Sequence, residues 1–181
     1  MGYKYKGKYL IDLNMAYNGT DRFGKNNRFG FFPAVGIGYA ISEENFFKNV
    51  DWLKKNVQLL KIRASYGLVG SDVAAGNRYL YEQVYQENGN YPFGDYPADS
   101  PVIKEGDLGT PSVTWEKAKK FDVGLDMNLF NKVSFTIDYF LDKRYDQLVT
   151  RADVPLIIGI GYAPSNVART TNQGFDGQIG Y

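Results

Sequence analysis

DRFGKNNRFGFFPAVGIGYAISEE, residues 21–44, begins as a polar turn, becomes an apolar run that contains several glycines, and ends at Ser-Glu-Glu. Small residues occupy every second position of the run, and larger apolar residues stand between them. Because successive side chains of a β-strand point to opposite faces of a sheet, this alternation predicts a strand with two different faces. The small face would hold Ala34, Gly36, Gly38 and Ala40, and the apolar face Val35, Ile37, Tyr39 and Ile41.

The composition supports an all-β protein of ordinary globular size. The 181 residues include 20 Gly, 15 Tyr and 12 Phe, and 16% of the chain is aromatic. Aromatic residues favour strands and glycines favour the turns between them. The absence of Cys and His removes thiolate and imidazole catalysis and the common zinc sites. A net charge of +1 gives no reason to expect a nucleic-acid partner.

Five further segments show the same period of two. Each places apolar residues on one face and polar or small residues on the other, and the tight turn at 130–132 makes a hairpin of two of them. We therefore expect about six antiparallel strands, at 9–17, 34–41, 59–66, 121–129, 133–141 and 175–181. Tyr79, Tyr81, Gln83 and Tyr85 are expected to extend a strand beyond this wall.

One connection is expected to be helical. Ser42 is a suitable N-cap, and Phe46, Val50, Leu53 and Val57 follow at helical spacing. These positions predict one short amphipathic helix within 42–57. No run of 18 apolar residues suggests a transmembrane helix, and no apolar core of a secretory signal follows Met1.

Alternation alone does not say which face meets water. A soluble sandwich buries the apolar face, whereas a membrane barrel turns it toward lipid. Tyr9 and Tyr17 bracket a nine-residue strand, close to the length of a tilted membrane strand with aromatic girdles at its ends. Long loops also alternate with shorter connections. These features favour a membrane barrel, but the residue pattern leaves both arrangements open.

Several longer motifs narrow the choice. They are RFGKNNRFGFFPAVGIGYAISEENFF, LLKIRASYGLVGS, TWEKAKKFDVGLDMNLFNKVSFTIDYFLDKRYDQL and NQGFDGQI, in this order from about Lys8 to the end of the chain. In combination they resemble the barrel of the SusC/RagA family of TonB-dependent outer-membrane transporters. The resemblance implies an antiparallel up-and-down transmembrane β-barrel, with extracellular loops at 18–28, 67–112 and 143–170 and periplasmic connections at 42–57 and 130–132.

The resemblance also implies parts that the chain does not contain. Such transporters have an N-terminal plug inside a barrel of about 22 strands, and six strands cannot close around a plug. We therefore expect residues 1–181 to be part of a barrel domain, from the later part of the barrel. The family implies import of oligosaccharides or peptides, a SusD-like lipoprotein lid, and energy from TonB through the plug.

The polar faces of the strands supply the candidate contacts of a lumen. These are Asp12, Asn14, Lys61, Arg63, Asp122, Asp126, Asn128 and Asp138. A solvated or plug-facing wall is the simpler interpretation of this set. Aromatic residues of the longest loop are candidates for stacking on sugars, although they could equally pack on one another: Tyr85, Tyr91, Phe93 and Tyr96.

No residue constellation predicts catalysis, a metal site or a cofactor. Asp142 and Asp146 could in principle act as a carboxylate pair on a glycoside, but no second feature supports that role. Trp115 is expected to be an interfacial anchor. The preferred hypothesis is an outer-membrane importer in contact with lipid; the alternative is a soluble or surface β-sheet module that binds carbohydrate.

Overall fold

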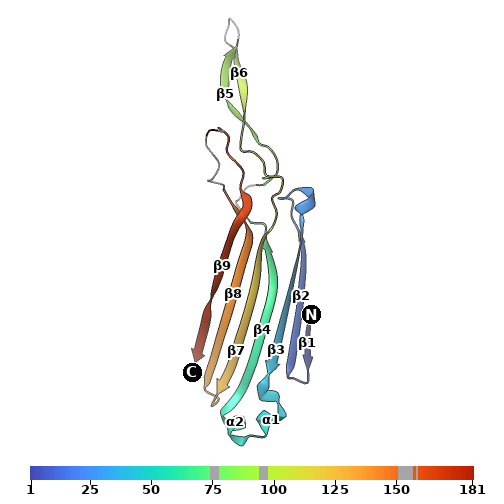
Figure 1. Cartoon of the computed structure of the whole chain (residues 1–181), viewed down its shortest axis with the longest axis vertical. Helices are drawn as coiled ribbons and strands as arrows, with labels where there is room; N and C mark the ends of the chain where they lie inside the picture. Colours follow the sequence, from blue (N-terminus) through green and yellow to red (C-terminus); the bar gives the residue numbers. More distant parts are fainter. Residues whose placement is uncertain (74–77, 94–97, 151–156, 158) are drawn as a thin grey trace.

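The computed structural model describes residues 1–73, 78–93, 98–150, 157 and 159–181. Within these residues the chain forms a seven-stranded antiparallel sheet and a separate two-stranded sheet (Figure 1). The large sheet has the order β1-β2-β3-β4-β7-β8-β9, with β1 Gly2–Tyr5, β2 Tyr9–Gly19, β3 Phe29–Ala40, β4 Val57–Ser71, β7 Glu116–Leu129, β8 Val133–Val149 and β9 Ser165–Gly180. The small sheet pairs β5 Tyr85–Phe93 with β6 Ala98–Glu105.

The six expected wall strands are all present, and several are longer than the sequence pattern indicated. The described part of the chain adds β1, which pairs with β2 from Gly2 opposite Asp12 to Tyr5 opposite Tyr9. This strand was missed because four residues are too short for a periodic signal. The strand expected at 79–85 was also wrong: these residues form turns and loops, and β5 begins only at Tyr85.

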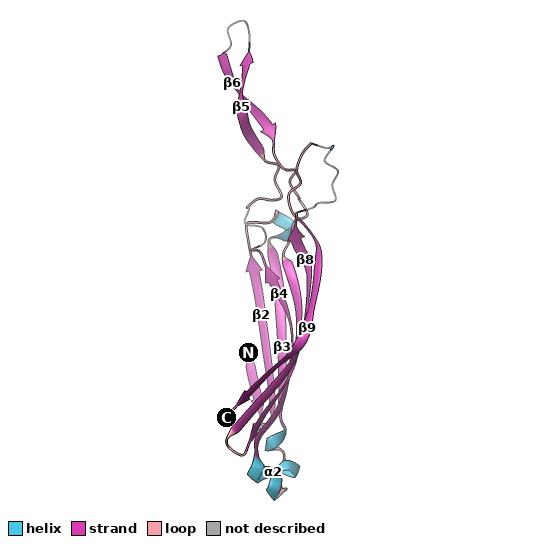
Figure 2. Ribbon diagram, turned by 90° about the vertical axis from the view of Figure 1, so that its left-hand side faces the viewer, coloured by secondary structure: helices cyan, strands magenta, loops and turns pink. Residues whose placement is uncertain are grey.

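The connections separate into two groups at opposite ends of the sheet. The β2–β3 connection, the loop that carries the β5–β6 hairpin, the C-terminal end of β8 and the N-terminal end of β9 lie at the upper end in Figure 1. The short turns and helices lie at the lower end. The sheet is curved (Figure 2), and β1 and β9 are its edge strands. This grouping matches the loop assignment implied by the family resemblance.

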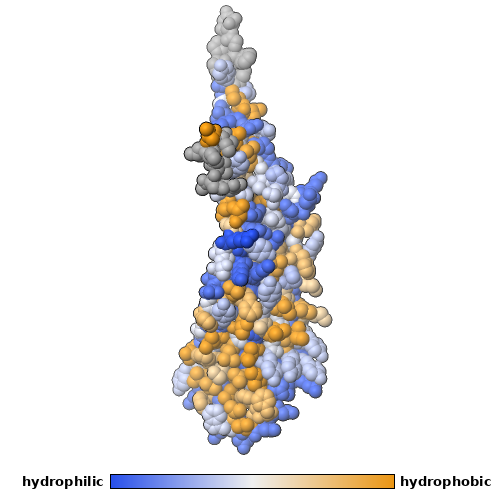
Figure 3. Space-filling view, in the orientation of Figure 1, coloured by the Kyte–Doolittle hydropathy of each residue, from blue (hydrophilic) through white to orange (hydrophobic). Residues whose placement is uncertain are grey.

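The apolar face of the sheet is continuous across strands. The ladder places one row of side chains side by side from β2 to β9, and this row consists of Ile11, Ile37, Ala64, Val123, Tyr139 and Phe175. Large apolar side chains on this face remain open to solvent, as for Leu13 at 47% and Met15 at 74% exposure. Figure 3 shows apolar residues gathered over the lower part of the strands. The face therefore lacks a cover within the described residues.

Aromatic side chains border the apolar face at both ends of β2 and β3. At the lower end Tyr9 stacks on Tyr39 with ring centroids 5.1 Å apart, and Tyr5 stacks on Tyr9 at 6.5 Å. At the upper end Tyr17 stacks on Phe29 at 5.4 Å. Two aromatic borders around an apolar band are the arrangement of a membrane barrel wall.

A compact hydrophobic cluster closes the upper end of the sheet. It joins residues that are far apart in the sequence: Phe23, Phe32, Leu80, Val113, Trp115 and Ala163. Trp115 is only 5% exposed and meets Phe23 and Phe32 edge-on, with centroids 5.7 and 5.2 Å away. The expected role of Trp115 as an interfacial anchor was therefore wrong, because the long loops fold over its indole and remove it from any interface.

Hydrogen bonds hold the same end together. Asn27 Nδ2 donates to the carbonyl of Val113 at 3.0 Å, and the Asn166 side chain both accepts from the Thr114 N–H and donates to the Thr114 carbonyl at 2.9 Å. Asn166 Nδ2 also donates to the carbonyl of Asp146 at 2.6 Å. Two asparagines thus satisfy loop backbone groups that have no strand partner, which explains how irregular chain can pack tightly here.

The lower connection is helical but not one helix. It contains a 3₁₀ turn at Ile41–Glu43 and two short helices, α1 Asn45–Lys48 and α2 Asp51–Asn56. Val50 adopts an extended backbone (φ −99°, ψ 105°) and separates the two. The predicted apolar stripe was also wrong, since Phe46 and Val50 are exposed whereas Phe47 is 4% exposed. No helix in the described residues has the length and hydropathy needed to cross a membrane.

Glu44 attaches this connection to the lower aromatic border. Its carboxylate accepts from Lys8 Nζ at 2.8 Å, from Tyr39 Oη at 3.1 Å and from Tyr9 Oη at 3.4 Å. The hydrogen bond from Lys8 is the largest influence that holds the pKa of Glu44 below its usual range. The second connection at the lower end is the turn between β7 and β8. It is tight because Phe130 and Asn131 both adopt positive φ, 56° and 55°.

The loop-end cluster predicts different consequences for the two tryptophans. Trp115→Ala should destabilise the upper end by about 3–5 kcal/mol, since it empties a packed site. The matched change Trp52→Ala removes an exposed indole and should cost less than about 0.5 kcal/mol. Amide hydrogen exchange of residues 108–115 in the intact protein measures the difference. Equal protection in the two variants would contradict the assignment of Trp115 to a core.

The Glu44 contacts predict a pH dependence. Because the folded-state pKa is lowered, the stabilisation is present above the unfolded pKa and is lost as the pH falls through the folded pKa. Amide exchange of residues 41–56, corrected for the intrinsic rate, should therefore increase as the pH is lowered from about 6 to about 3. Glu44→Gln should remove the part of this increase that comes from the Glu44 contacts. Glu43→Gln is the comparison, because the hydrogen bond from Lys48 also lowers the pKa of Glu43. The Glu43–Lys48 pair is more exposed than the Glu44–Lys8 pair and should contribute less; an equal effect of both variants would argue against Glu44.

Candidate functional site on the polar face

An arginine and three aspartates meet on the polar face of the sheet. Arg63 on β4 donates from Nη2 to Asp138 Oδ2 on β8 at 2.8 Å. Its Nε lies 3.4 Å from Asp126 Oδ2, and its Nη1 lies 3.8 Å from Asp122 Oδ1, both on β7. The guanidinium therefore bridges three neighbouring strands. We call Arg63, Asp122, Asp126 and Asp138 the Arg63 cluster.

A glycine makes this geometry possible. The ladder places Gly124 directly between Arg63 and Asp138, so the arginine must cross β7 to reach its partner. A Cβ at Gly124 would lie 2.8 Å from Arg63 Nε and would also collide with the Asp138 carboxylate. Because Gly124 has no side chain, the guanidinium of Arg63 can cross β7 and reach Asp138 on β8.

The Arg63 cluster carries more negative than positive charge. Three carboxylates face one guanidinium, and Lys61, opposite Asp126 in the ladder, supplies a second cation on the same face. With two cations and three anions, these five side chains carry a formal charge of −1. The groups are partly open to water, with Arg63 at 37% and Asp138 at 19% side-chain exposure. Each pair is therefore worth about 1 kcal/mol or less, and the cluster orients strands more than it stabilises them.

The other predicted polar residues lie at varying distances along this face. Asp12 shares a cross-strand row with Gly36, Ser65 and Asp122, and a shallow hollow of about 210 Å³ runs from Asp12 to Arg63. The floor of the hollow is low because β3 contributes only small residues there. Asn14 lies one row higher, opposite Ala34.

Asn128 is not part of the Arg63 cluster. It lines a separate hollow at the lower end, with Gln58 and Ser134. Two further residues of this face were not among the candidates: Thr136, whose Oγ1 donates to Asp126 Oδ1 at 3.4 Å, and Asp176, which stands opposite Asp138 in the ladder. The alternation along the sequence already places both on the polar face, and this was the signal from which they could have been chosen.

The loop aromatics do not join the polar face. Tyr85 and Tyr91 belong to β5, in the hairpin that projects beyond the upper end of the sheet, and both are exposed. The side chain of Phe93 and the whole of Tyr96 lie outside the described part of the structure. The structure thus separates the two sets of candidates that the sequence identified.

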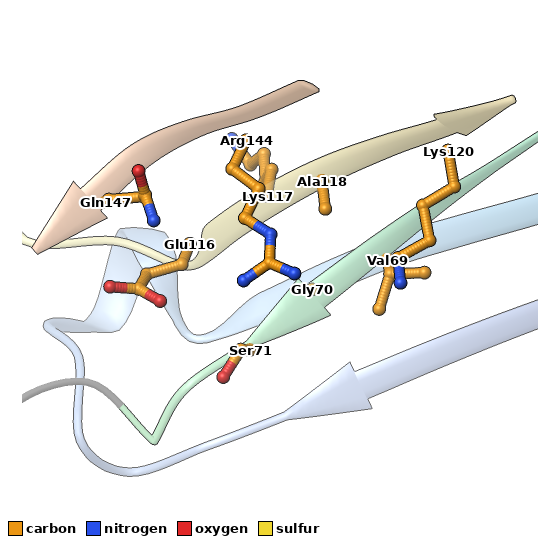
Figure 4. A pocket seen from close by; sticks show the side chains of 9 residues that line it. All are labelled: Val69, Gly70, Ser71, Glu116, Lys117, Ala118, Lys120, Arg144 and Gln147. Atoms are coloured by element: carbon orange, nitrogen blue, oxygen red, sulfur yellow. The ribbon is translucent and has the colours of Figure 1, made fainter. Parts of the chain in front are cut away.

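A second pocket, of about 220 Å³, lies near the upper ends of β4, β7 and β8 (Figure 4). Its polar groups are already engaged by neighbours. Glu116 accepts from the N–H of Leu148 at 2.8 Å, and Arg144 pairs with Asp142 at 3.1 Å. This pocket therefore offers few free groups to a ligand.

Asp142 and Asp146 do not form a catalytic pair. Asp142 is buried beside Arg144 and Lys120, whereas Asp146 pairs with Lys117 at 3.5 Å. Each carboxylate is committed to its own cations. Among the residues that the structure describes, no group of three or more acidic side chains is arranged to hold a metal ion.

Comparison with known proteins identifies the same architecture. Residues 2–181 match the family model described as TonB dependent receptor-like, beta-barrel. The chain is 32% identical over 181 residues to TonB-dependent receptor P39 of Formosa agariphila, covering 99% of this chain and 16% of that protein. It is 32% identical over 162 residues to TonB-dependent receptor SusC of Bacteroides thetaiotaomicron, covering 86% of this chain and 15% of SusC.

A solved structure superposes over nearly the whole chain. The RagAB peptide importer in its closed-closed state matches with a TM-score of 0.82 and 25% identity, covering 98% of this chain and 18% of the matched chain. The chain thus spans about one sixth of the length of these relatives. Its open sheet, with one apolar and one polar face, corresponds to a segment of a barrel wall, and the chain belongs to the TonB-dependent receptor-like β-barrel family of outer-membrane proteins, with the SusC/RagA-type transporters among its relatives.

Proposed function

We propose that this chain forms part of the wall and extracellular loops of a TonB-dependent importer in the bacterial outer membrane. Residues 1–181 would belong to the barrel domain, and the plug and remaining strands would be supplied by the rest of the parent protein. The observation that carries the proposal is the two-faced sheet. One face is apolar, uncovered and bordered by aromatics at both ends, while the other carries the Arg63 cluster.

The solute is proposed to be an oligosaccharide or a peptide. SusC is a TonB-dependent receptor, and RagAB is described as a peptide importer. By analogy with these relatives, a SusD-like lipoprotein would cover the extracellular loops, and TonB would act through the plug. The exposed Tyr85 and Tyr91 on the projecting hairpin are in a position to contact either the lipoprotein or the solute.

The polar face is proposed to line the lumen and to meet the plug. Its members are Asp12, Asn14, Lys61, Arg63, Asp122, Asp126, Asn128 and Asp138. Because Arg63 ties β4 to β7 and β8, we assign the Arg63 cluster to bracing the wall, and we assign no catalytic role to any of these side chains. The family is one of transporters and receptors, which accords with a function without chemistry.

A soluble carbohydrate-binding module is not favoured. Such a module would bury its apolar face against a second sheet, but the apolar side chains of β2 and β3 remain exposed in a row across the strands. Contact with lipid removes that apolar face from water without the need for a second sheet.

Adjacent positions on β2 test which face meets the membrane. Spin labels at Leu13 and Asn14, introduced one at a time as cysteines in the reconstituted parent protein, should report opposite environments, because neighbouring strand residues point to opposite faces. The label at Leu13 should be relaxed by oxygen dissolved in lipid, and the label at Asn14 should be shielded from it. If both were shielded equally, Leu13 would face a protein core and the barrel-wall proposal would fail.

A pair of glycines tests the bracing role. Gly124→Ala places a methyl group where Arg63 and Asp138 meet, and should destabilise the barrel by about 1–3 kcal/mol. Gly36→Ala on β3 is the matched control, since the nearest atom to its added Cβ is the Asp12 Cβ at an ordinary 3.7 Å. The temperature at which the folded parent barrel loses its compact gel mobility should fall for Gly124→Ala only. Equal temperatures for both variants would remove the bracing role from the Arg63 cluster.

A further inference from the structure

Basic side chains gather on the apolar side of the sheet, directly above the apolar band. Lys119 on β7 and Lys143 on β8 are Cα partners in the ladder, and Arg169 on β9 lies two residues from Thr171, which pairs with Lys143. Strand alternation places all three on the same face as the row of Tyr66, Phe121 and Leu141. Lys119 and Lys143 stand one row above it, and Arg169 stands one row higher still. Figure 3 shows strongly hydrophilic residues immediately above the apolar region of this face.

These cations are poorly neutralised by the protein. Lys119, Lys143 and Arg169 are exposed, and within the described residues none of the three has an ion-pair partner. Like charges directly opposite each other in a ladder are unfavourable, so a bound anion would stabilise the Lys119–Lys143 pair. Asp146, which follows Tyr145 on β8, is paired with Lys117 at 3.5 Å.

An aromatic ring contacts Lys119, one of the three cations, without cancelling its charge. Lys119 Nζ lies 5.3 Å and Lys117 Nζ 5.9 Å from the centroid of the Tyr145 ring. Such contacts orient the ammonium groups. They leave the charges available for an anion that approaches from the membrane side.

The position of the cations defines the chemistry of that anion. The row that contains Lys119 and Lys143 stands two residues, or about 7 Å, beyond the row of Tyr66, Phe121 and Leu141. A ligand that contacts both the lysine row and the apolar row below it must contain anionic groups and a hydrocarbon part. We propose that Lys119, Lys143 and Arg169 bind the phosphate groups of a phosphorylated glycolipid in the outer leaflet, with the chemistry of lipopolysaccharide, while its acyl chains cover the apolar residues below.

The chain offers a matched control for these two lysines, because the next residue after each one is also basic but points to the polar face. Lys120 follows Lys119, and Arg144 follows Lys143; both pair with Asp142 on the polar side. The test compares K119Q/K143Q with K120Q/R144Q in the detergent-purified, full-length parent transporter. Binding of lipopolysaccharide is measured by titration at fixed ionic strength, and retention of the lipid during purification by mass spectrometry.

Each basic residue near an anionic surface contributes roughly fivefold to affinity, so K119Q/K143Q should weaken binding about 25-fold. K120Q/R144Q should stay within about twofold of the unchanged protein, and K119R/K143R should retain binding because it keeps the charges. An equal loss in both glutamine variants would mean that overall charge, and not this face, binds the lipid. An unchanged affinity of K119Q/K143Q would also overturn the proposal.

Two further experiments use the transporter without substitutions, so they do not depend on the folding of any variant. They test whether the site binds a lipid phosphate or a free anion. Enzymatically dephosphorylated lipopolysaccharide should bind about 100-fold more weakly than the intact lipid, since it lacks the groups that Lys119, Lys143 and Arg169 contact. Inorganic phosphate at millimolar concentration should not displace the intact lipid. Equal binding of the dephosphorylated lipid, or ready displacement by phosphate, would refute a lipid-phosphate site.

Discussion

The continuous hydrogen-bonded register from β2 to β9 is the constraint on which the rest of this structure depends. The register aligns the apolar side chains from Ile11 to Phe175 in one row on one face, and it aligns Arg63, Gly124 and Asp138 in one row on the other. A slip of one residue in any pair would move lysines and aspartates into the apolar face. In lipid the same ladder has a second role, because backbone groups there have no water to satisfy them.

The two ends of the sheet solve different problems. At the lower end the turns are short, and a single carboxylate, that of Glu44, ties the helical connection to Lys8 and to the tyrosine border. At the upper end the loops are long and need a core of their own. Trp115 provides its centre, and Asn27 and Asn166 satisfy the loop backbone around it. This packed cluster forms the base from which the β5–β6 hairpin projects.

Because successive side chains of a strand point to opposite faces, neighbouring charged residues lie on different faces of the sheet. Lys119 and Lys120 are neighbours in sequence, yet one stands above the apolar band and the other pairs with Asp142 on the polar side. In the Arg63 cluster the guanidinium pairs with three carboxylates, whereas Lys119, Lys143 and Arg169 have no ion-pair partner among the described residues. This contrast explains why the polar face is best understood as a braced wall and the upper apolar side as a surface that still needs an anionic partner.

The sequence by itself determined the six wall strands from β2 to β9, their faces and the family, because period two is a local property and the long motifs are contiguous. It also identified Arg63 and its three aspartates as members of one face. It did not reveal that they meet, since that contact depends on Gly124 lying between Arg63 and Asp138 across three strands. Only the tertiary structure decided that Trp115 is core and not an anchor, that the connection at 42–57 breaks at Val50, and that Phe47 and not Phe46 is buried. These features depend on contacts between residues far apart in the chain, and no local pattern carries that information.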